Sequence, residues 1–244
     1  MLIPGFDEFE LDLERAFKRD LPPFIESVGA APLTYVNIAT IPVKRNGVYL
    51  LLQDDNVMYV GKTDSQAGFQ NRLTRHAIHI QHRKNLDPHS ISFKAISIPV
   101  FKNADLEGML IQHFEAPWNY SGFGSNDPGR KRDTQEPANF DKQYPIDIDI
   151  PLALVPEKTV RCYELLRILS VNLPYTFRFE KKEYQEELDI PITIPHENMT
   201  VRDLLLLILK NLPEGKWQAT VLLGRVILYR EIKNYPFHQL IIRS

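Results

Sequence analysis

The sequence is poor in cysteine and in long hydrophobic runs. Cys162 is the single cysteine among 244 residues, so no disulfide can form within the chain, as is usual for proteins of a reducing compartment. The longest aliphatic stretch, residues 204–209, is far too short to cross a bilayer. The N-terminus is acidic and lacks the basic region of a signal peptide. We therefore expect a cytoplasmic protein without a membrane span.

Two common kinds of site are also absent from the sequence. No Walker A loop occurs, and the lone cysteine excludes the Cys/His spacings typical of zinc sites. The formal net charge of −2 does not by itself indicate a nucleic-acid-binding protein. However, residues 62–102 contain seven Lys or Arg, four His and only two acids. A local basic surface decides nucleic-acid affinity, so this region is a candidate for binding.

Apolar spacing predicts the elements of the first 145 residues. We expect a helix over residues 7–28 that is stopped by Pro22-Pro23, and strands within residues 35–63. A helix is expected over 68–84, a strand over 91–101 and a second helix over 104–115. Residues 120–145 are rich in Gly, Pro, Asp, Asn and Ser and read as a long loop or linker.

The last hundred residues contain a weak internal repeat. Thr159-Val160-Arg161 is echoed by Thr200-Val201-Arg202, and each copy continues through a leucine pair to Leu-Pro. Each copy combines a first strand (148–154 or 190–194), an amphipathic helix and a last strand (175–179 or 218–229). Two such β-α-β units would bury both helices between them. We place a domain boundary near residue 145, giving domains 1–145 and 146–244.

Residues 46–63, NGVYLLLQDDNVMYVGKT, predict a hairpin with one tyrosine on each strand. With a three-residue loop at residues 54–56, Leu51 lies opposite Tyr59, and Tyr49 and Tyr59 then share a face. A two-residue loop would place the two tyrosines on opposite faces. Tyrosine is common in strands, so ordinary packing in a core is the alternative to a site.

Two helices carry further candidates. On the first, Arg72, His76, His79 and Arg83 follow at helical spacing on one face, which is either a solvated surface or a cationic surface for phosphate. On the second, Glu107 borders the apolar side. A carboxylate turned toward an interior needs a partner, which is either a cation or a metal.

The order Gly-Val-Tyr, Tyr-Val-Gly, Asn-Arg-Leu-x-x-x-His, then Glu followed twelve residues later by Asn, resembles the GIY-YIG nuclease superfamily. The likeness covers roughly residues 46–119. The tail GFGSNDPGR at 122–130 is similar to the type II restriction-endonuclease branch. Val48 and Val60 replace the usual isoleucines, and both are conservative strand substitutions.

The resemblance implies an α+β fold with a three-stranded antiparallel sheet flanked by helices, and phosphodiester hydrolysis with one divalent metal. Mg²⁺ or Mn²⁺ would be held by Glu107. Tyr49 would act as general base or proton relay with help from His76, and Tyr59 would orient the water or a phosphate oxygen. Arg72 would stabilise charge on the scissile phosphate, and Asn119 would hold the geometry. The implied catalytic residues are Tyr49, Tyr59, Arg72, His76, Glu107 and Asn119.

Contacts to double-stranded DNA outside this set are assigned from local positive charge. Ordinary solvation is the alternative for each of these side chains. The candidates are Lys62, Arg75, His79, Arg83, Lys84, Arg130, Lys131 and Arg132.

The C-terminal repeat is similar to the small βαβ-βαβ modules called secretin and TonB N-terminal domains. The likeness rests on hydrophobic pattern, the Thr-Val-Arg helix starts and the Leu-Pro exits. Only the architecture is borrowed, and we expect a module for recognition, dimerisation or partner binding.

These observations predict a metal-dependent, sequence-specific DNA endonuclease of restriction type, acting as a homodimer or by successive nicks. One alternative is an anti-phage, toxin or homing-type nuclease with the same chemistry. A further alternative is a non-catalytic DNA-binding module on a decayed nuclease fold.

Overall fold

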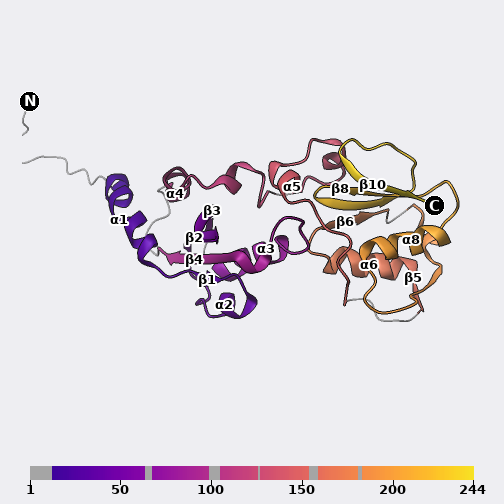
Figure 1. The fold of residues 1–244 in the computed structure, drawn as a ribbon, viewed down its shortest axis with the longest axis horizontal. Helices are drawn as coiled ribbons and strands as arrows, with labels where there is room; N and C mark the ends of the chain where they lie inside the picture. The colour runs from indigo at the N-terminus through magenta and orange to yellow at the C-terminus, as the bar shows by residue number, and fades with distance from the viewer. Residues whose placement is uncertain (1–12, 64–67, 99–104, 126, 154–158, 181–182) are drawn as a thin grey trace, which may run out of the picture. The chain divides into compact units, whose positions relative to one another are not determined.

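The chain folds into alternating helices and short strands, shown in Figure 1 for a computed structural model. The structure describes residues 13–63, 68–98, 105–125, 127–153, 159–180 and 183–244. These divide into two compact units. The first unit comprises Met1–Arg75 and His89–Tyr120, and the second comprises His76–Pro88 and Ser121–Ser244. Each unit is described by itself below.

The first unit contains a four-stranded antiparallel sheet in the order β1-β4-β2-β3. Three strands were expected, and the fourth is the short edge strand β1, which pairs with β4. The elements of this unit are α1 (Leu13–Ser27), β1 (Ala31–Pro32), α2 (Tyr35–Ala39), β2 (Gly47–Gln53), β3 (Asn56–Thr63), α3 (Gly68–His79, whose last turn belongs to the second unit), η1 (Pro88–Ser90), β4 (Ile91–Ser97), α4 (Leu106–Phe114) and η2 (Pro117–Tyr120).

Helices α1 and α4 pack against the same face of this sheet. Leu21 and Ile25 of α1 and Leu110 of α4 join the core formed by Val48, Leu50 and other alternate residues of the strands. This packing explains why α1 runs through Pro22-Pro23 to Ser27, where the sequence predicted a stop. The fixed φ of proline is itself helical, and burial of Leu21 and Ile25 offsets the missing amide donors.

Other boundaries of the first unit also differ from expectation. Residues 35–39, expected as strand, form α2, which is capped by the Thr34 hydroxyl accepting from the amide of Asn37. The predicted helix 68–84 ends at His79. His82 and Asn85 then take positive φ values of 50° and 63°, which a helix does not allow. Residues 1–12, 64–67 and 99–104, which carried parts of three expected elements, lie outside the described residues.

The second unit has a two-stranded sheet, β5-β7, and a four-stranded sheet in the order β10-β8-β9-β6. Leucines of α6 and α8 share one hydrophobic core with both sheets. Its elements are η3 (Gly129–Thr134), α5 (Asn139–Gln143), β5 (Thr159–Arg161), α6 (Cys162–Asn172), β6 (Thr176–Phe179), α7 (Gln185–Leu188), β7 (Pro191–Thr193), α8 (Val201–Asn211), β8 (Gln218–Leu222), β9 (Arg225–Tyr229) and β10 (His238–Arg243).

The repeat is therefore present, with corrections to its strands. The segment 148–153 forms no strand, and the first strand of the first copy is β5, directly before α6. The first strands of the two copies pair with each other, and the last strands join the other sheet, so the two strands of one copy never share a sheet. Residues 218–229 make a hairpin of two strands because Leu223-Gly224 turns the chain. The likeness to secretin and TonB modules stays a prediction.

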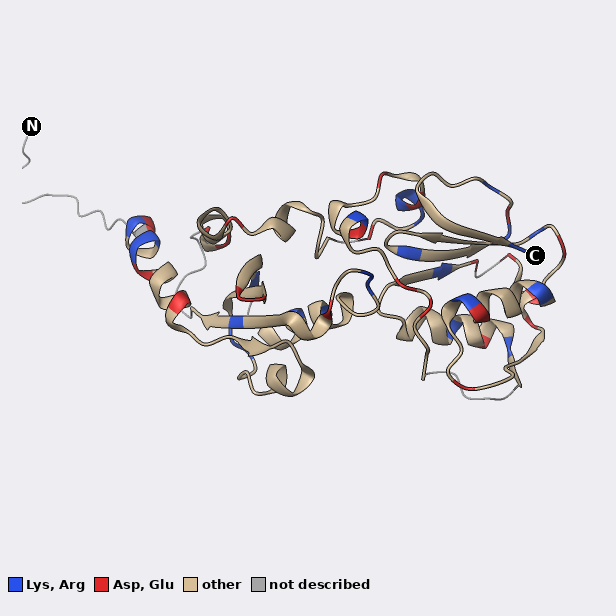
Figure 2. Ribbon diagram, in the orientation of Figure 1, with Lys and Arg blue, Asp and Glu red and all other residues tan. Residues whose placement is uncertain are grey.

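Charge is spread over both units. In Figure 2, α1 carries Lys and Arg beside Asp and Glu, and the strands of the C-terminal sheet carry isolated Arg residues. Among the described helices, none has the length and hydropathy that a membrane span requires.

Candidate active site

The hairpin of β2 and β3 places both tyrosines on one face, but not through the predicted loop. Gln53 pairs with Asn56, so the turn has only two residues, Asp54 and Asp55, with φ values of 49° and 66°. Two consecutive positive φ values are typical of a type I′ hairpin turn. The register then shifts between Leu51 and Leu52, since Met58 is an extra residue on β3. This bulge restores the pairing of Leu51 with Tyr59.

The predicted shared face is therefore confirmed, although the predicted loop length was wrong. Tyr49 is opposite Gly61 and Tyr59 is opposite Leu51, and paired residues of adjacent strands point to the same side. The two ring centroids are 6.2 Å apart, with the ring planes inclined at 44°. The phenols are hydrogen-bonded to each other, with Tyr49 as the donor.

Burial controls the acidity of both phenols. Tyr49 is only 2% exposed, and its burial raises its pKa far above the ordinary value of a tyrosine. The neighbouring Tyr59 and the charge of Glu107 raise it further, whereas Arg72 lowers it. Burial likewise raises the pKa of Tyr59, with Glu107 adding to the effect and Arg72 and Arg75 opposing it. Both phenols are thus neutral hydrogen-bond donors and acceptors at neutral pH.

Arg72 supplies positive charge at these phenols from α3. Its side chain is half-buried, and its Nε atom is buried without a hydrogen-bond partner among the described residues. An unpaired guanidinium donor at a buried position needs a partner of opposite charge or an acceptor. A phosphate oxygen is such an acceptor.

Glu107 lies in the first turn of α4. Its carboxylate Oε2 is 3.2 Å from Nζ of Lys62, and its side chain is 24% exposed. Strand alternation puts Lys62 on the other face of β3 from Tyr59. Because β3 is an edge strand, the charge of Glu107 still acts on both tyrosines around that edge.

Glu107 could supply one carboxylate ligand to a hard divalent cation. Among the described residues, no three His, Cys, Asp or Glu side chains converge as a metal cage. A single partly exposed carboxylate suits Mg²⁺, which keeps several waters and is often shared with substrate phosphates. Lys62, whose side chain is 66% exposed, neutralises this carboxylate and can move away into solvent. Glu107 would therefore hold the cation together with water and phosphate oxygens.

Asn119 fixes the outer edge of the sheet. Its side-chain nitrogen donates to the carbonyl of Val60 at 2.7 Å, and its side-chain oxygen accepts from the amide of Val60 at 2.8 Å. These bonds replace the ladder that a fifth strand would supply to β3. Asn119 thus holds the Tyr-Val-Gly segment in place, as the sequence predicted in general terms.

His76 and His79 lie on the last turn of α3, within the second unit. His76 is 4% exposed and stacks on Phe123, with ring centroids 4.9 Å apart. His79 also stacks on Phe123, at 5.2 Å, and is tilted against Phe140 at 5.5 Å. The alternative of a solvated face is therefore wrong for His76, which aromatic packing buries, whereas His79 is half-buried. The role of His76 as a helper of Tyr49 stays a prediction.

Arg83 is not a surface residue, and its assignment to DNA contact is corrected. Its side chain is 1% exposed and donates to Asp141 Oδ1 at 2.8 Å and to the carbonyl of Tyr144 at 2.9 Å. The guanidinium also lies 5.2 Å from the ring centre of Phe140. A buried ion pair of this kind serves the fold of the second unit.

The remaining predicted DNA contacts differ in the exposure and the ion pairing of their side chains. Lys62, Arg75, Lys84 and Lys131 are exposed. Arg130 is paired with Glu180 at 3.4 Å and Glu231 at 3.1 Å and lies over the ring of Tyr229. Arg132 is half-buried and makes no side-chain hydrogen bond or ion pair with a described residue. These residues are predicted DNA contacts, with Arg130 the weakest candidate.

Comparison with known protein families gives a match over the segment that contains most of the candidate active-site residues. Residues 53–146 match the model of the Eco29kI GIY-YIG domain. The chain carries a GIY-YIG domain. The match supports a nuclease of the restriction-endonuclease type in general terms. The GIY-YIG match begins at residue 53, so Tyr49 is assigned by its position in the hairpin. A search of curated proteins found no match.

Two features of the GIY-YIG domain escaped the sequence reading. Gly61 clears the space for the ring of Tyr49, which the adjacent Tyr-Val-Gly motif could have signalled. The segment 121–146, read as a loop or linker, contains η3 and α5 and places Asp133 at 1% exposure. Asp133 has no sequence signal because its partners, Arg178, Arg225 and Tyr229, lie more than forty residues away.

Proposed function

We propose that the protein is a metal-dependent endonuclease that hydrolyses phosphodiester bonds in duplex DNA at a specific sequence. One observation carries the proposal. The hydrogen-bonded phenols of Tyr49 and Tyr59 share a face of the sheet. Arg72 lowers the pKa of both phenols, and Glu107 raises it. A phosphodiester attacked by water needs a group that accepts a proton, positive charge at the phosphate and a site for a cation.

Three residues of the first unit contribute to phosphate binding, orientation of the water and the geometry of the site. The unpaired Nε of Arg72 donates to a non-bridging phosphate oxygen and stabilises the charge that develops there. Tyr59 accepts the hydrogen bond of Tyr49 and orients the attacking water through its own hydroxyl. Asn119 keeps both groups in register by holding Val60.

Tyr49 relays the proton of the attacking water: the neutral phenol takes that proton as it passes its own hydroxyl proton to His76, and its raised pKa opposes a charged phenolate. Burial and Glu107 both favour the neutral phenol. Glu107 would hold Mg²⁺ or Mn²⁺, which would supply positive charge and offset the charge of this carboxylate. Arg72 lowers the pKa of Tyr49 and so favours release of the phenol proton during the relay. His76 is the predicted helper in this transfer.

The experiment is cleavage of a plasmid library by the full chain with Mg²⁺, followed by mapping of the ends. We expect cuts at one sequence motif, none in EDTA, and none with Glu107→Gln, which should still bind DNA. Glu115→Gln, an exposed carboxylate after the same helix, is the matched control and should cut normally. Wild-type cutting by Glu107→Gln would overturn the assignment of the site.

The pattern of ends also separates the remaining functions. Random ends would favour an anti-phage, toxin or homing-type nuclease over a restriction enzyme. Binding without cutting under all metal conditions would favour the non-catalytic DNA-binding module. A palindromic motif cut on both strands at once would support a homodimer, which sedimentation of the protein on its target duplex would detect.

A further inference from the structure

An open pocket of about 80 Å³ lies in the second unit and is lined by none of the implied catalytic residues. Its wall combines charged groups with hydroxyl and imidazole groups. A smaller hollow of about 10 Å³ adjoins it and shares Arg132, Arg225, Gly224 and Asp141. The larger pocket is lined by His79, Gly122, Ser125, Asp127, Arg132, Ala138, Phe140, Asp141, Thr176, Gly224 and Arg225.

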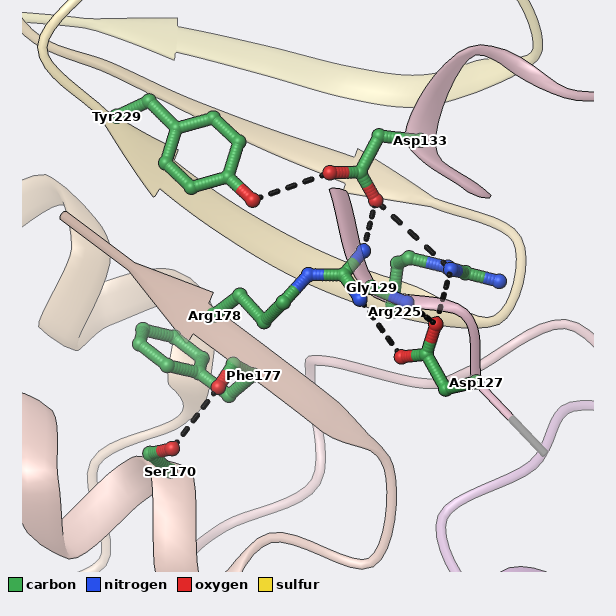
Figure 3. A network of polar contacts seen from close by, with 8 residues as sticks. All are labelled: Asp127, Gly129, Asp133, Ser170, Phe177, Arg178, Arg225 and Tyr229. Carbon is green, nitrogen blue, oxygen red and sulfur yellow. Dashed lines mark hydrogen bonds and ion pairs between the residues drawn. The ribbon is translucent and has the colours of Figure 1, made fainter. Parts of the chain in front are cut away.

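A network of polar contacts holds Asp127 and Asp133, which lie on either side of Arg132 in the chain (Figure 3). Asp133, the next residue, accepts a hydrogen bond from the hydroxyl of Tyr229 at 3.0 Å and is paired with Arg178. Asp127 pairs with Arg178 at 2.7 Å and accepts from the amide of Gly129 at 3.0 Å. The turn η3 is thereby fastened to β6 and β9 at both of its ends, so the backbone of Arg132 is held before any ligand arrives.

Arg225 is the under-neutralised member of this network. Arg178 forms the closer ion pairs with Asp127 and Asp133. Nη1 of Arg225 lies 3.4 Å from Asp127 and 3.8 Å from Asp133. The side chain of Arg225 is 11% exposed. Burial and the neighbouring Arg178 lower the pKa of Arg225, and Asp127 and Asp133 act in the opposite direction.

The acids of the pocket do not bind Arg132, and Arg225 shares Asp127 with Arg178. Asp141 is bonded to Arg83 at 2.8 Å, and Asp127 is bonded to Arg178 at 2.7 Å. Arg83 and Arg178 do not line the pocket, whereas Arg225 lines it and also donates to Asp127 at 3.4 Å. Two guanidinium groups are left facing the pocket, and Arg132 has no side-chain partner among the described residues.

The chemistry of the pocket suits a phosphate group. Two guanidinium groups recognise phosphate by paired hydrogen bonds, and the hydroxyls of Ser125 and Thr176 are further donors for its oxygens. The neighbouring Arg130 does not contribute, because Glu180 and Glu231 bind it. An extended hydrophobic ligand is excluded, since Phe140 and Ala138 are the only apolar side chains that line the pocket.

We propose that this pocket binds a backbone phosphate of DNA outside the cleavage site, through Arg132 and Arg225. The proposal rests on the proposed function for the nature of the ligand. It gives the second unit a defined task, which is to hold the duplex by its backbone while the active site acts. Phosphate contacts of this kind fix register and orientation and make binding dependent on salt.

The test measures binding of a fluorescein-labelled 30-base-pair duplex by full-length Glu107→Gln protein in EDTA, at several NaCl concentrations. Adding Arg132→Gln should weaken binding roughly three- to tenfold and reduce the salt slope by about one. Arg161→Gln is the matched control, since it removes one exposed arginine charge, paired with Asp189, from the same unit and should leave the slope unchanged. Thr176→Val is a second pocket variant. It should weaken DNA binding, while the midpoint of thermal unfolding of the protein stays unchanged.

Two outcomes would overturn the proposal. In the first, Arg132→Gln and Arg161→Gln have equal affinities and slopes. In the second, inorganic phosphate binds in an Arg132-dependent way while the DNA salt slope stays the same, which would assign the pocket to a free phosphate. Failure of the proposed function is distinct, because it appears as absence of cleavage by the wild-type chain with Mg²⁺, whatever the salt slopes show.

Discussion

The ring of Tyr49 occupies the space directly above Gly61 on the neighbouring strand. The two residues are register partners, and a Cβ atom at position 61 would overlap Cζ and Oη of the tyrosine. Gly61 of the Tyr-Val-Gly motif therefore leaves room for the ring of Tyr49 of the Gly-Val-Tyr motif. This contact sets where the phenol of Tyr49 lies relative to Tyr59.

Gly61→Ala should displace the Tyr49 ring and destabilise the first unit. Overpacking of a close-packed site costs about 1–3 kcal/mol, and the ring has little room because Tyr49 is 2% exposed. Urea unfolding followed by tyrosine fluorescence measures the loss. Gly29→Ala is the control, because a Cβ at residue 29 meets nothing within 4 Å. Equal stability of the two variants would show that Tyr49 can adapt.

Asn119→Ala should loosen β3. It leaves the amide and carbonyl of the buried Val60 without partners, and an unsatisfied buried polar group costs about 1–3 kcal/mol. Hydrogen exchange of the Val60 amide should accelerate more than that of amides in β4. Asn119→Asp should behave similarly, because its second oxygen faces the carbonyl of Val60. Unchanged protection at Val60 would contradict this reading.

Stability should fall in alkaline solution. The folded-state pKa values of Tyr49 and Tyr59 are raised, so the folded chain keeps protons that the unfolded chain loses above about pH 10. Their contribution is complete below that pH and is lost as the pH rises. Urea midpoints between pH 8 and pH 11 should decline, and Tyr49→Phe should decline less steeply than wild type. Parallel declines would show that Tyr49 is not the buried phenol responsible.

Asp133→Asn should unfold the second unit more readily. The carboxylate is 1% exposed and serves Arg178 and Tyr229, and breaking a buried ion pair from one side costs about 3–5 kcal/mol. Thermal unfolding by circular dichroism gives the change. Asp149→Asn removes a bidentate but half-exposed pair with Arg202 and should cost less than about 1 kcal/mol. A small effect at Asp133 would mean that the network of Figure 3 contributes little to stability.

Divalent metal should bind to the protein without DNA, and weakly. With Glu107 as the one carboxylate, Mn²⁺ titrated by electron paramagnetic resonance should show one site that Glu107→Gln removes. Lys62→Met should strengthen Mn²⁺ binding, because the ammonium at 3.2 Å no longer competes for the carboxylate. Identical Mn²⁺ binding in wild type and Glu107→Gln would place the metal elsewhere.

Much of the first unit follows from the sequence by itself. Alternating apolar residues predicted β2, β3 and β4, and helical spacing predicted α3 and α4, because strands and helices bury side chains at fixed periods. The order of motifs predicted the GIY-YIG domain, and the matched segment 53–146 confirms it. The local repeat likewise predicted α6 and α8.

Only the tertiary structure decided which side chains those elements bring together. The shared face of Tyr49 and Tyr59 depends on a bulge at Met58 that offsets a two-residue turn, and no local pattern encodes that choice. Arg83 looked like a surface cation, yet it is buried because Asp141 and Tyr144, about sixty residues later, supply its partners. The charge balance around Arg132 and Arg225 has the same origin. Sequence periodicity reports what each segment buries, whereas the partner that neutralises a charge is set by contacts between segments far apart in the chain.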